Sequence, residues 1–154
     1  MTIQTGDNLP NVTARATGEK SVALPSLAGK AVVFYFYPKD ATPGCTTEAQ
    51  EFRDLAPEFE ALGCRIFGVS RDSLNSHEKF KANECLPFDL LSDPDESLCL
   101  AFDVIKMKNM YGKQVMGIER STFLFDAAGK LHLEWRKVKA PGHAAEVLKA
   151  VKSL

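Results

Sequence analysis

One segment, residues 31–48, constrains the fold of this chain more than any other part of it. Its sequence, AVVFYFYPKDATPGCTTE, joins a continuous apolar run to a short loop rich in Pro and Gly and then to a cysteine, Cys45. The β-branched and aromatic residues at 31–37 predict a strand buried on both faces. Apolar residues then recur at three- and four-residue steps, which predicts a helix that begins near Cys45. A helix N-terminus carries about half a positive charge and unpaired N–H donors, so Cys45 is a candidate reactive thiolate.

The remaining sequence predicts alternating strands and helices. Strands are expected at 12–16 and 21–24 as an N-terminal hairpin, then at 65–70, 88–91, 121–125 and 131–135. Helices are expected after Ser73, after Asp93-Pro94 and at the C-terminal end. This order is typical of an α/β, thioredoxin-like fold with an N-terminal β-hairpin and a central mixed sheet flanked by helices. Residues 106–117 show no clean period and are expected to form a long surface loop.

Composition limits the kind of protein and its partners. The chain has 154 residues, 45% of them hydrophobic, which predicts a single domain spanning residues 1–154. Its 19 Lys and Arg nearly balance its 20 Asp and Glu, so neither nucleic acid nor a membrane surface is expected as a partner. The first ten residues lack the pattern of a signal peptide, and no apolar stretch reaches about 20 residues. We therefore expect a cytoplasmic protein.

Cysteine and histidine spacing argues against two kinds of site. The four cysteines contain no CxxC pair, and the three histidines are scattered without ligand spacing, so no metal site is expected. A disulfide reductase of the thioredoxin type would need a cysteine at position 48, where the chain has Glu48. No motif indicates flavin, haem or nucleotide, so we expect no cofactor.

The motif around Cys45 resembles that of a known family. Pro38, Thr42 and Cys45 reproduce the PxxxTxxC pattern of peroxiredoxins. The strings YPKDATPGCTTEA, GVSRDS, LLSDPD and GIERSTFLFDAAGK, in this order along the chain, are similar to the bacterioferritin-comigratory, or Q-type, branch. The resemblance implies a thiol-dependent peroxidase that reduces hydrogen peroxide and organic hydroperoxides through a sulfenic acid at Cys45.

The same resemblance assigns roles to the neighbours of Cys45. It implies that Thr42 hydrogen-bonds the thiolate or the peroxide, that Pro38 shields the sulfur, and that Arg120 places a permanent cation beside both. Backbone N–H groups of Gly44 and Cys45 would supply further donors. Glu48 either reaches back to a backbone N–H group as part of a cap or is solvated, and we leave it outside the predicted site.

The second half of the catalytic cycle stays open in the sequence. Q-type members commonly carry a resolving cysteine five residues after the first, where this chain has Gln50, and a second subgroup carries it at a position that corresponds to Lys81. Cys85 is the remaining candidate, although Leu86-Pro87 indicates that its helix is already ending. The other two cysteines, Cys64 and Cys99, are expected to be buried structural residues.

Two cycles and one other class of function remain. The favoured hypothesis is a one-cysteine cycle in which thioredoxin, glutaredoxin or glutathione reduces the sulfenic acid, in a protein expected to be a monomer. The alternative is an internal disulfide between Cys45 and Cys85. A different class would be a redox sensor or holdase, whose sulfenic acid signals to a partner while turnover is negligible.

Overall fold

Strands and helices alternate along the chain, and the computed structural model describes residues 3–154. The strands are β1 (Thr13–Ala16), β2 (Lys20–Ala23), β3 (Val32–Phe36), β4 (Arg65–Ser70), β5 (Asp89–Ser92), β6 (Ile105–Met110), β7 (Lys113–Ile118), β8 (Ser121–Phe125) and β9 (Leu131–Trp135). The helices are the 3₁₀ helix η1 (Leu24–Leu27), α1 (Pro43–Ala61), α2 (Leu74–Glu84), α3 (Ser97–Ala101) and α4 (His143–Lys152). None of these helices is both long and apolar enough to cross a membrane.

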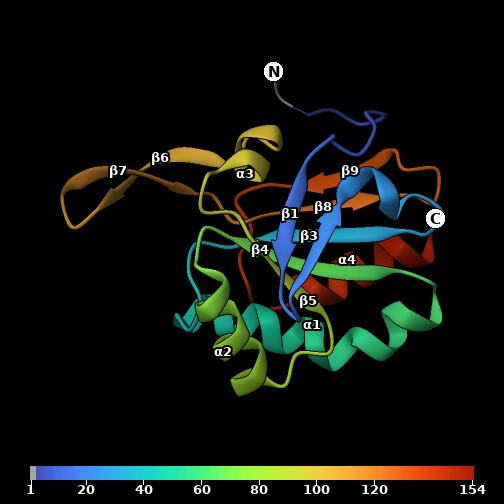
Figure 1. Ribbon diagram of the computed structural model, residues 1–154, viewed down its shortest axis with the longest axis horizontal. Coiled ribbons are helices and arrows are strands. Elements are labelled where there is room, and N and C mark those ends of the chain that lie inside the picture. Colours follow the sequence, from blue (N-terminus) through green and yellow to red (C-terminus); the bar gives the residue numbers. More distant parts are fainter. Residues whose placement is uncertain (1–2) are drawn as a thin grey trace.

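A seven-stranded mixed sheet in the order β2-β1-β5-β4-β3-β8-β9 forms the centre of the molecule (Figure 1). β3, β4 and β5 run parallel to one another, whereas β1 pairs antiparallel with β5 and β8 pairs antiparallel with β3. β1 and β2 form the N-terminal hairpin. These pairings confirm the predicted mixed α/β fold with its N-terminal hairpin.

The central strand β3 separates two apolar cores. All five of its residues are buried, and successive side chains point to opposite faces of a sheet. Phe34 therefore packs with η1 and α3 on one face, and Tyr35 packs with α1 and α4 on the other. Figure 1 shows α1, α2 and α4 gathered on the same side of the sheet. Cys45 belongs to this second core.

Residues 106–117 form a hairpin, so the prediction of a surface loop was wrong. β6 and β7 pair antiparallel through a two-residue turn, in which Tyr111 and Gly112 have φ values of 53° and 79°. Two positive φ values in succession fit a type I′ turn, whose twist matches that of the strands. The hairpin extends from the rest of the molecule (Figure 1). Since most of β7 is exposed, burial imposes no alternation of polar and apolar residues, and the usual strand signal is weak.

Candidate active site

Cys45 is the third residue of α1, at the end of the loop that leaves β3. Pro43 opens the helix, where a missing N–H group costs nothing, and Thr42 is its extended N-cap residue. The first intrahelical bond runs from the Thr46 N–H to the Thr42 carbonyl oxygen at 2.8 Å. The N–H groups of Gly44 and Cys45 therefore precede the helical ladder, as the sequence predicted. The Cys45 side chain is only 1% exposed.

Arg120 connects the sulfur to a carboxylate. Its Nη2 donates to Cys45 Sγ at 3.3 Å, and its Nη1 donates to Glu48 Oε1 at 2.7 Å. Arg120 lies in the short connection between β7 and β8, a strand that pairs with β3, so the sheet sets the position of its backbone. A Cβ atom on Gly44 would lie 3.1 Å from Nη2 of Arg120, so glycine leaves room for the guanidinium group.

Glu48 is neither solvated nor bonded to a backbone N–H group in the described structure, but lies buried beside Cys45 and paired with Arg120. Its side chain is fully buried, and burial raises its pKa from 4.5 to about 7, although the Arg120 charge acts in the opposite direction. Its second oxygen, Oε2, has no hydrogen-bond partner among the described residues. The signal was present in the sequence, because residues three apart on a helix share a face, and Cys45 and Glu48 are so spaced.

Thr42 and Pro38 occupy the loop that leads to Cys45. Pro38 lies two residues beyond the end of β3 and is half-buried, and Thr42 ends the loop at the N-cap position. The Thr42 hydroxyl donates its proton to the Lys39 carbonyl oxygen at 2.8 Å. A hydroxyl group has one proton and two lone pairs, so the Thr42 oxygen can still accept a hydrogen bond in the site.

Two further cations lie near Arg120. A Cβ atom on Gly117 would come within 3.8 Å of both the Lys108 side chain and the Arg71 guanidinium group. Partial burial lowers the pKa of Lys108, and repulsion from Arg120 adds to this effect. The charge of Lys108 also interacts with that of Cys45. The site is thus rimmed by the positive charges of Arg120, Lys108 and Arg71.

The other cysteines differ sharply in environment. Cys64 and Cys99 are buried, and burial raises the pKa of the Cys64 thiol to about 12 and that of Cys99 further, as expected for structural thiols. Cys85 is exposed and forms the left-handed C-cap of α2, so the helix does end there. Its neighbour Glu84 is bound to α1, because its side chain accepts from Gln50 Nε2 at 2.8 Å.

One group of side chains near the site has the composition of a metal site. Asp40, Asp72 and His77 each place one possible ligand atom within 4.8 Å of the others. His77 Nδ1, however, lies 2.7 Å from Asp40 Oδ2, and His77 Nε2 lies 2.9 Å from the Leu91 carbonyl oxygen. Both ring nitrogens are therefore engaged in direct hydrogen bonds in this arrangement.

Comparison with known proteins identifies the family. The profile described as AhpC/TSA family matches residues 5–133 of the chain. The chain belongs to the AhpC/TSA family, the peroxiredoxins. It is therefore a thiol peroxidase, an enzyme that acts on peroxides and is returned to its reduced form by a thiol.

Relatives within the peroxiredoxins lie in the predicted branch. The chain is 57% identical to the Peroxiredoxin Bcp of Xanthomonas campestris pv. campestris over 137 residues, which is 89% of this chain and 86% of that one. It is 50% identical to the Peroxiredoxin Bcp of Bacillus subtilis over 154 residues, which is all of this chain and 98% of that one.

Solved structures of the same branch have the same fold. The bacterioferritin comigratory protein of Xanthomonas campestris, solved in work on its alkyl peroxide reduction activity, superposes with a TM-score of 0.91 at 51% identity, covering 97% of this chain and 98% of that one. A cysteine mutant of PrxQ from Xylella fastidiosa superposes with a TM-score of 0.94 at 45% identity, covering 99% and 98% of the two chains. These likenesses confirm the thioredoxin-like fold and the Q-type resemblance.

Proposed function

We propose that Cys45 is the thiol that reacts with hydrogen peroxide and organic hydroperoxides. Its thiolate attacks one peroxide oxygen, the O–O bond breaks, and the leaving oxygen takes a proton and departs as water or an alcohol. Sulfur is oxidised to sulfenic acid and the peroxide is reduced. The observation that carries this assignment is the 3.3 Å hydrogen bond from Arg120 to a buried Cys45 at a helix N-terminus.

Alignment of the peroxide contributes more rate than ionisation of the thiol. A free cysteine is only about 3% thiolate at pH 7, so complete ionisation raises the reactive fraction about 30-fold at most, or about 2 kcal/mol. Aligning two reactants and stabilising developing charge contribute far larger factors in enzymes. We assign that work to Arg120, to the N–H groups of Gly44 and Cys45, and to Thr42, with Pro38 shielding the sulfur.

The role of Thr42 can be made specific. Because its hydroxyl proton is held by Lys39, Thr42 would accept a hydrogen bond from the peroxide O–H group rather than donate one to the thiolate. A Thr42→Ser variant keeps this acceptor and should retain most of the peroxide rate. A Thr42→Val variant keeps the shape alone and should lose it.

We further propose a one-cysteine cycle. Gln50 lies five residues beyond Cys45 on α1, about 7.5 Å along the helix axis, and it is Gln50 that contacts Glu84 beside Cys85. A disulfide needs Cα atoms about 4.4 to 6.8 Å apart, so joining Cys85 to Cys45 would require local unfolding. The supported course is reduction of the sulfenic acid by two equivalents of an external thiol, which releases water and a disulfide of that thiol.

A comparison with the Xanthomonas relative points the same way. Two of its solved structures each replace a different cysteine with serine. If the first of these cysteines is placed on Cys45, their spacing puts the second on Lys81, which here forms an ion pair with Asp89 at 2.7 Å. The alternative, an internal disulfide between Cys45 and Cys85, would thus use a cysteine four residues beyond Lys81, the position that corresponds to the relative's second cysteine.

The proposed partners follow from this cycle. Thioredoxin, glutaredoxin or glutathione would supply the electrons, in the cytoplasm, to an enzyme that works as a monomer; likeness to the Q-type branch supports the monomer. Turnover with each reductant in separate assays would identify the partner, and light scattering would test the monomer. A redox sensor or holdase would consume peroxide only to about one equivalent, whereas a peroxidase continues while reductant remains.

Intact-protein mass after one equivalent of peroxide tests the cycle. The wild-type protein and the Cys85→Ser variant should both gain one oxygen atom, and both should lose it when the reductant is added. A loss of two mass units by the wild-type protein, with Cys45 and Cys85 both protected from alkylation, would instead establish the internal disulfide.

A further inference from the structure

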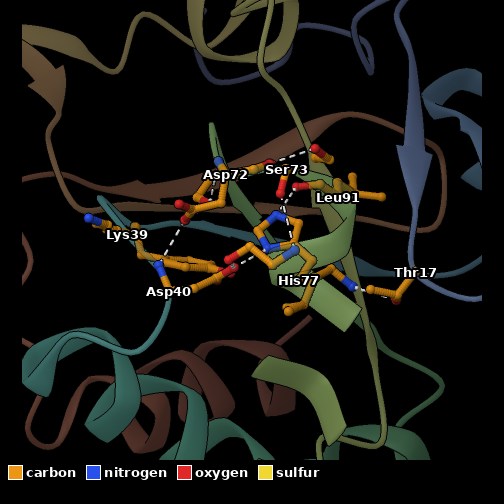
Figure 2. Close-up of polar contacts among 12 residues, drawn as sticks. Thr17, Lys39, Asp40, Asp72, Ser73, His77 and Leu91 are labelled. Atoms are coloured by element: carbon orange, nitrogen blue, oxygen red, sulfur yellow. Dashed lines mark hydrogen bonds and ion pairs between the residues drawn. The ribbon is translucent and has the colours of Figure 1, made fainter. Parts of the chain in front are cut away.

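The loop that carries Thr42 to the active site is fastened at one residue, Asp40. The backbone N–H of Asp40 donates to Asp72 Oδ2 at 2.8 Å, and its Oδ1 accepts from the Tyr37 hydroxyl at 2.6 Å. Its Oδ2 accepts from the Ser76 hydroxyl at 2.9 Å and lies 2.7 Å from His77 Nδ1. Figure 2 shows Asp40 and His77 side by side, with the Asp40 side chain directed from the loop toward α2.

His77 is fully buried between two acceptors. Its Nδ1 faces the Asp40 carboxylate, and its Nε2 faces the Leu91 carbonyl oxygen on β5 (Figure 2). The ring therefore contacts the loop on one side and β5 on the other. Burial opposes ionisation of Asp40, but its interactions with His77, Tyr37 and Ser76 together outweigh burial and lower the Asp40 pKa. The contacts of the buried His77 ring thus join the loop to α2 and β5.

The loop needs such fastening because its backbone is strained. Ala41, between Asp40 and Thr42, has a φ of 61°, in the left-handed region that non-glycine residues seldom adopt. Such conformations persist only where surrounding contacts enforce them. Asp40, directly before Ala41, makes four contacts. Directly after Ala41, the Thr42 hydroxyl donates to the Lys39 carbonyl oxygen. Release of Asp40 would let the loop relax and move Thr42 and the first turn of α1, which bears Cys45.

We propose that His77 is a positioning residue for the peroxide reaction: by holding Asp40, it keeps the loop in the conformation that aligns Thr42 and Cys45 with the peroxide. The ring nitrogens of His77 contact Asp40 and the Leu91 carbonyl oxygen, so His77 would act through the backbone between Asp40 and Cys45. The inference rests on the proposed role of Cys45 as the thiol that peroxide oxidises. Its consequence is a selective defect, because peroxide reduction requires an aligned pocket whereas alkylation of a thiol does not.

The experiment compares two reactions of Cys45 in the same variants. Rapid-quench mass spectrometry gives the rate of Cys45 oxidation by hydrogen peroxide, and iodoacetamide gives the rate of its alkylation. The variants are His77→Gln and, as a matched control, His132→Gln, which changes an exposed histidine on β9. The thiols of Cys64 and Cys99 report global unfolding in the same spectra, because burial raises their pKa and they become reactive only if the core opens.

The two rates should separate in His77→Gln alone. We expect peroxide oxidation to slow about tenfold or more while alkylation of Cys45 is not slowed, since small misplacements of reacting groups cost factors of about 10 to 100. The His132→Gln control should keep both rates. Unchanged peroxide oxidation in a folded His77→Gln protein would overturn the proposal, and so would an equal fall in both rates, which would indicate a change in the thiol itself.

A second variant keeps the proposal testable if His77→Gln does not fold. Asp40→Ala removes the carboxylate that His77 contacts and leaves the His77 ring in place. It should slow peroxide oxidation several-fold while Cys64 and Cys99 stay protected, and wild-type behaviour would overturn the proposal. Failure of the wild-type protein to oxidise at Cys45 is a different result and would overturn the proposed function instead.

Discussion

Replacing Glu48 with glutamine should stabilise the protein at alkaline pH and slow its reaction with peroxide. Burial raises the Glu48 pKa from 4.5 to about 7, so the folded protein keeps a proton that the unfolded chain loses. Between about pH 4.5 and pH 7, the unfolded chain has lost the Glu48 proton, whereas the folded protein still holds it because a buried charge is costly. The wild-type protein loses stability over this window, and a glutamine, which does not titrate, removes the loss.

The size of the effect follows from the shift in the Glu48 pKa. A shift from 4.5 to about 7 lowers the unfolding free energy by about 3 kcal/mol at high pH. This loss is complete above pH 7 and does not occur below pH 4.5. Other groups titrate in the same range, but they contribute equally to the wild-type protein and to Glu48→Gln. The difference between the two proteins thus isolates Glu48.

Urea denaturation at pH 4.5 and pH 8 measures that difference. The unfolding free energy of Glu48→Gln, relative to wild type, should be more favourable at pH 8 than at pH 4.5 by about 3 kcal/mol. Glu60→Gln, on the exposed side of α1, is the matched control and should show no such change. The peroxide rate of Glu48→Gln should fall, because Arg120 loses its charged anchor at 2.7 Å. A pH dependence identical to that of the wild-type protein would refute this reasoning.

Three other substitutions test separate parts of the structure. Gly44→Ala should raise stability by about 0.5–1 kcal/mol through helix propensity, yet slow peroxide oxidation several-fold in stopped flow, because its Cβ would lie 3.1 Å from Arg120. Gly68→Ala should cost about 2–3 kcal/mol in urea denaturation, because its Cβ would meet Leu90 at 2.7 Å. Burial lowers the His143 pKa from 6.5 to about 4, so as pH falls the unfolded chain takes up a proton before the folded protein does. Between pH 6.5 and pH 4 the unfolding free energy of the wild-type protein should therefore fall by up to about 3 kcal/mol, and that of His143→Gln should not show this fall.

The parts of the fold that follow from burial could be predicted from sequence. β4 and β8 have the predicted bounds, because a strand buried in the sheet requires a run or an alternation of apolar residues that is visible in the chain. The edge strand β9 also has its predicted bounds, although only Leu131 of its residues is buried. The β6–β7 hairpin was missed because it projects into solvent, where no core imposes a pattern. Its turn also places Tyr111 in the left-handed region, and a tyrosine is not a residue type that predicts such a turn.

The part of the candidate site that is continuous in the sequence could be predicted. The loop, the helix start and Cys45 are continuous in the chain, so their arrangement follows from residue types. The pairing of Arg120 with Glu48 joins residues 72 positions apart, from the β7–β8 connection and from α1, and no local pattern contains it. The contact between Asp40 and His77 joins residues 37 positions apart and was missed for the same reason.

Single-turnover oxidation of Cys45 tests the central claim most directly. Wild-type protein, Cys45→Ser and Cys85→Ser are each mixed with one equivalent of hydrogen peroxide, and peroxide consumption is followed together with the mass of the cysteine-containing peptides. Wild type and Cys85→Ser should consume the peroxide at the same rate and carry the oxidation at Cys45, whereas Cys45→Ser should leave the peroxide unreacted. Undiminished consumption by Cys45→Ser, or first oxidation at any other cysteine, would contradict the account.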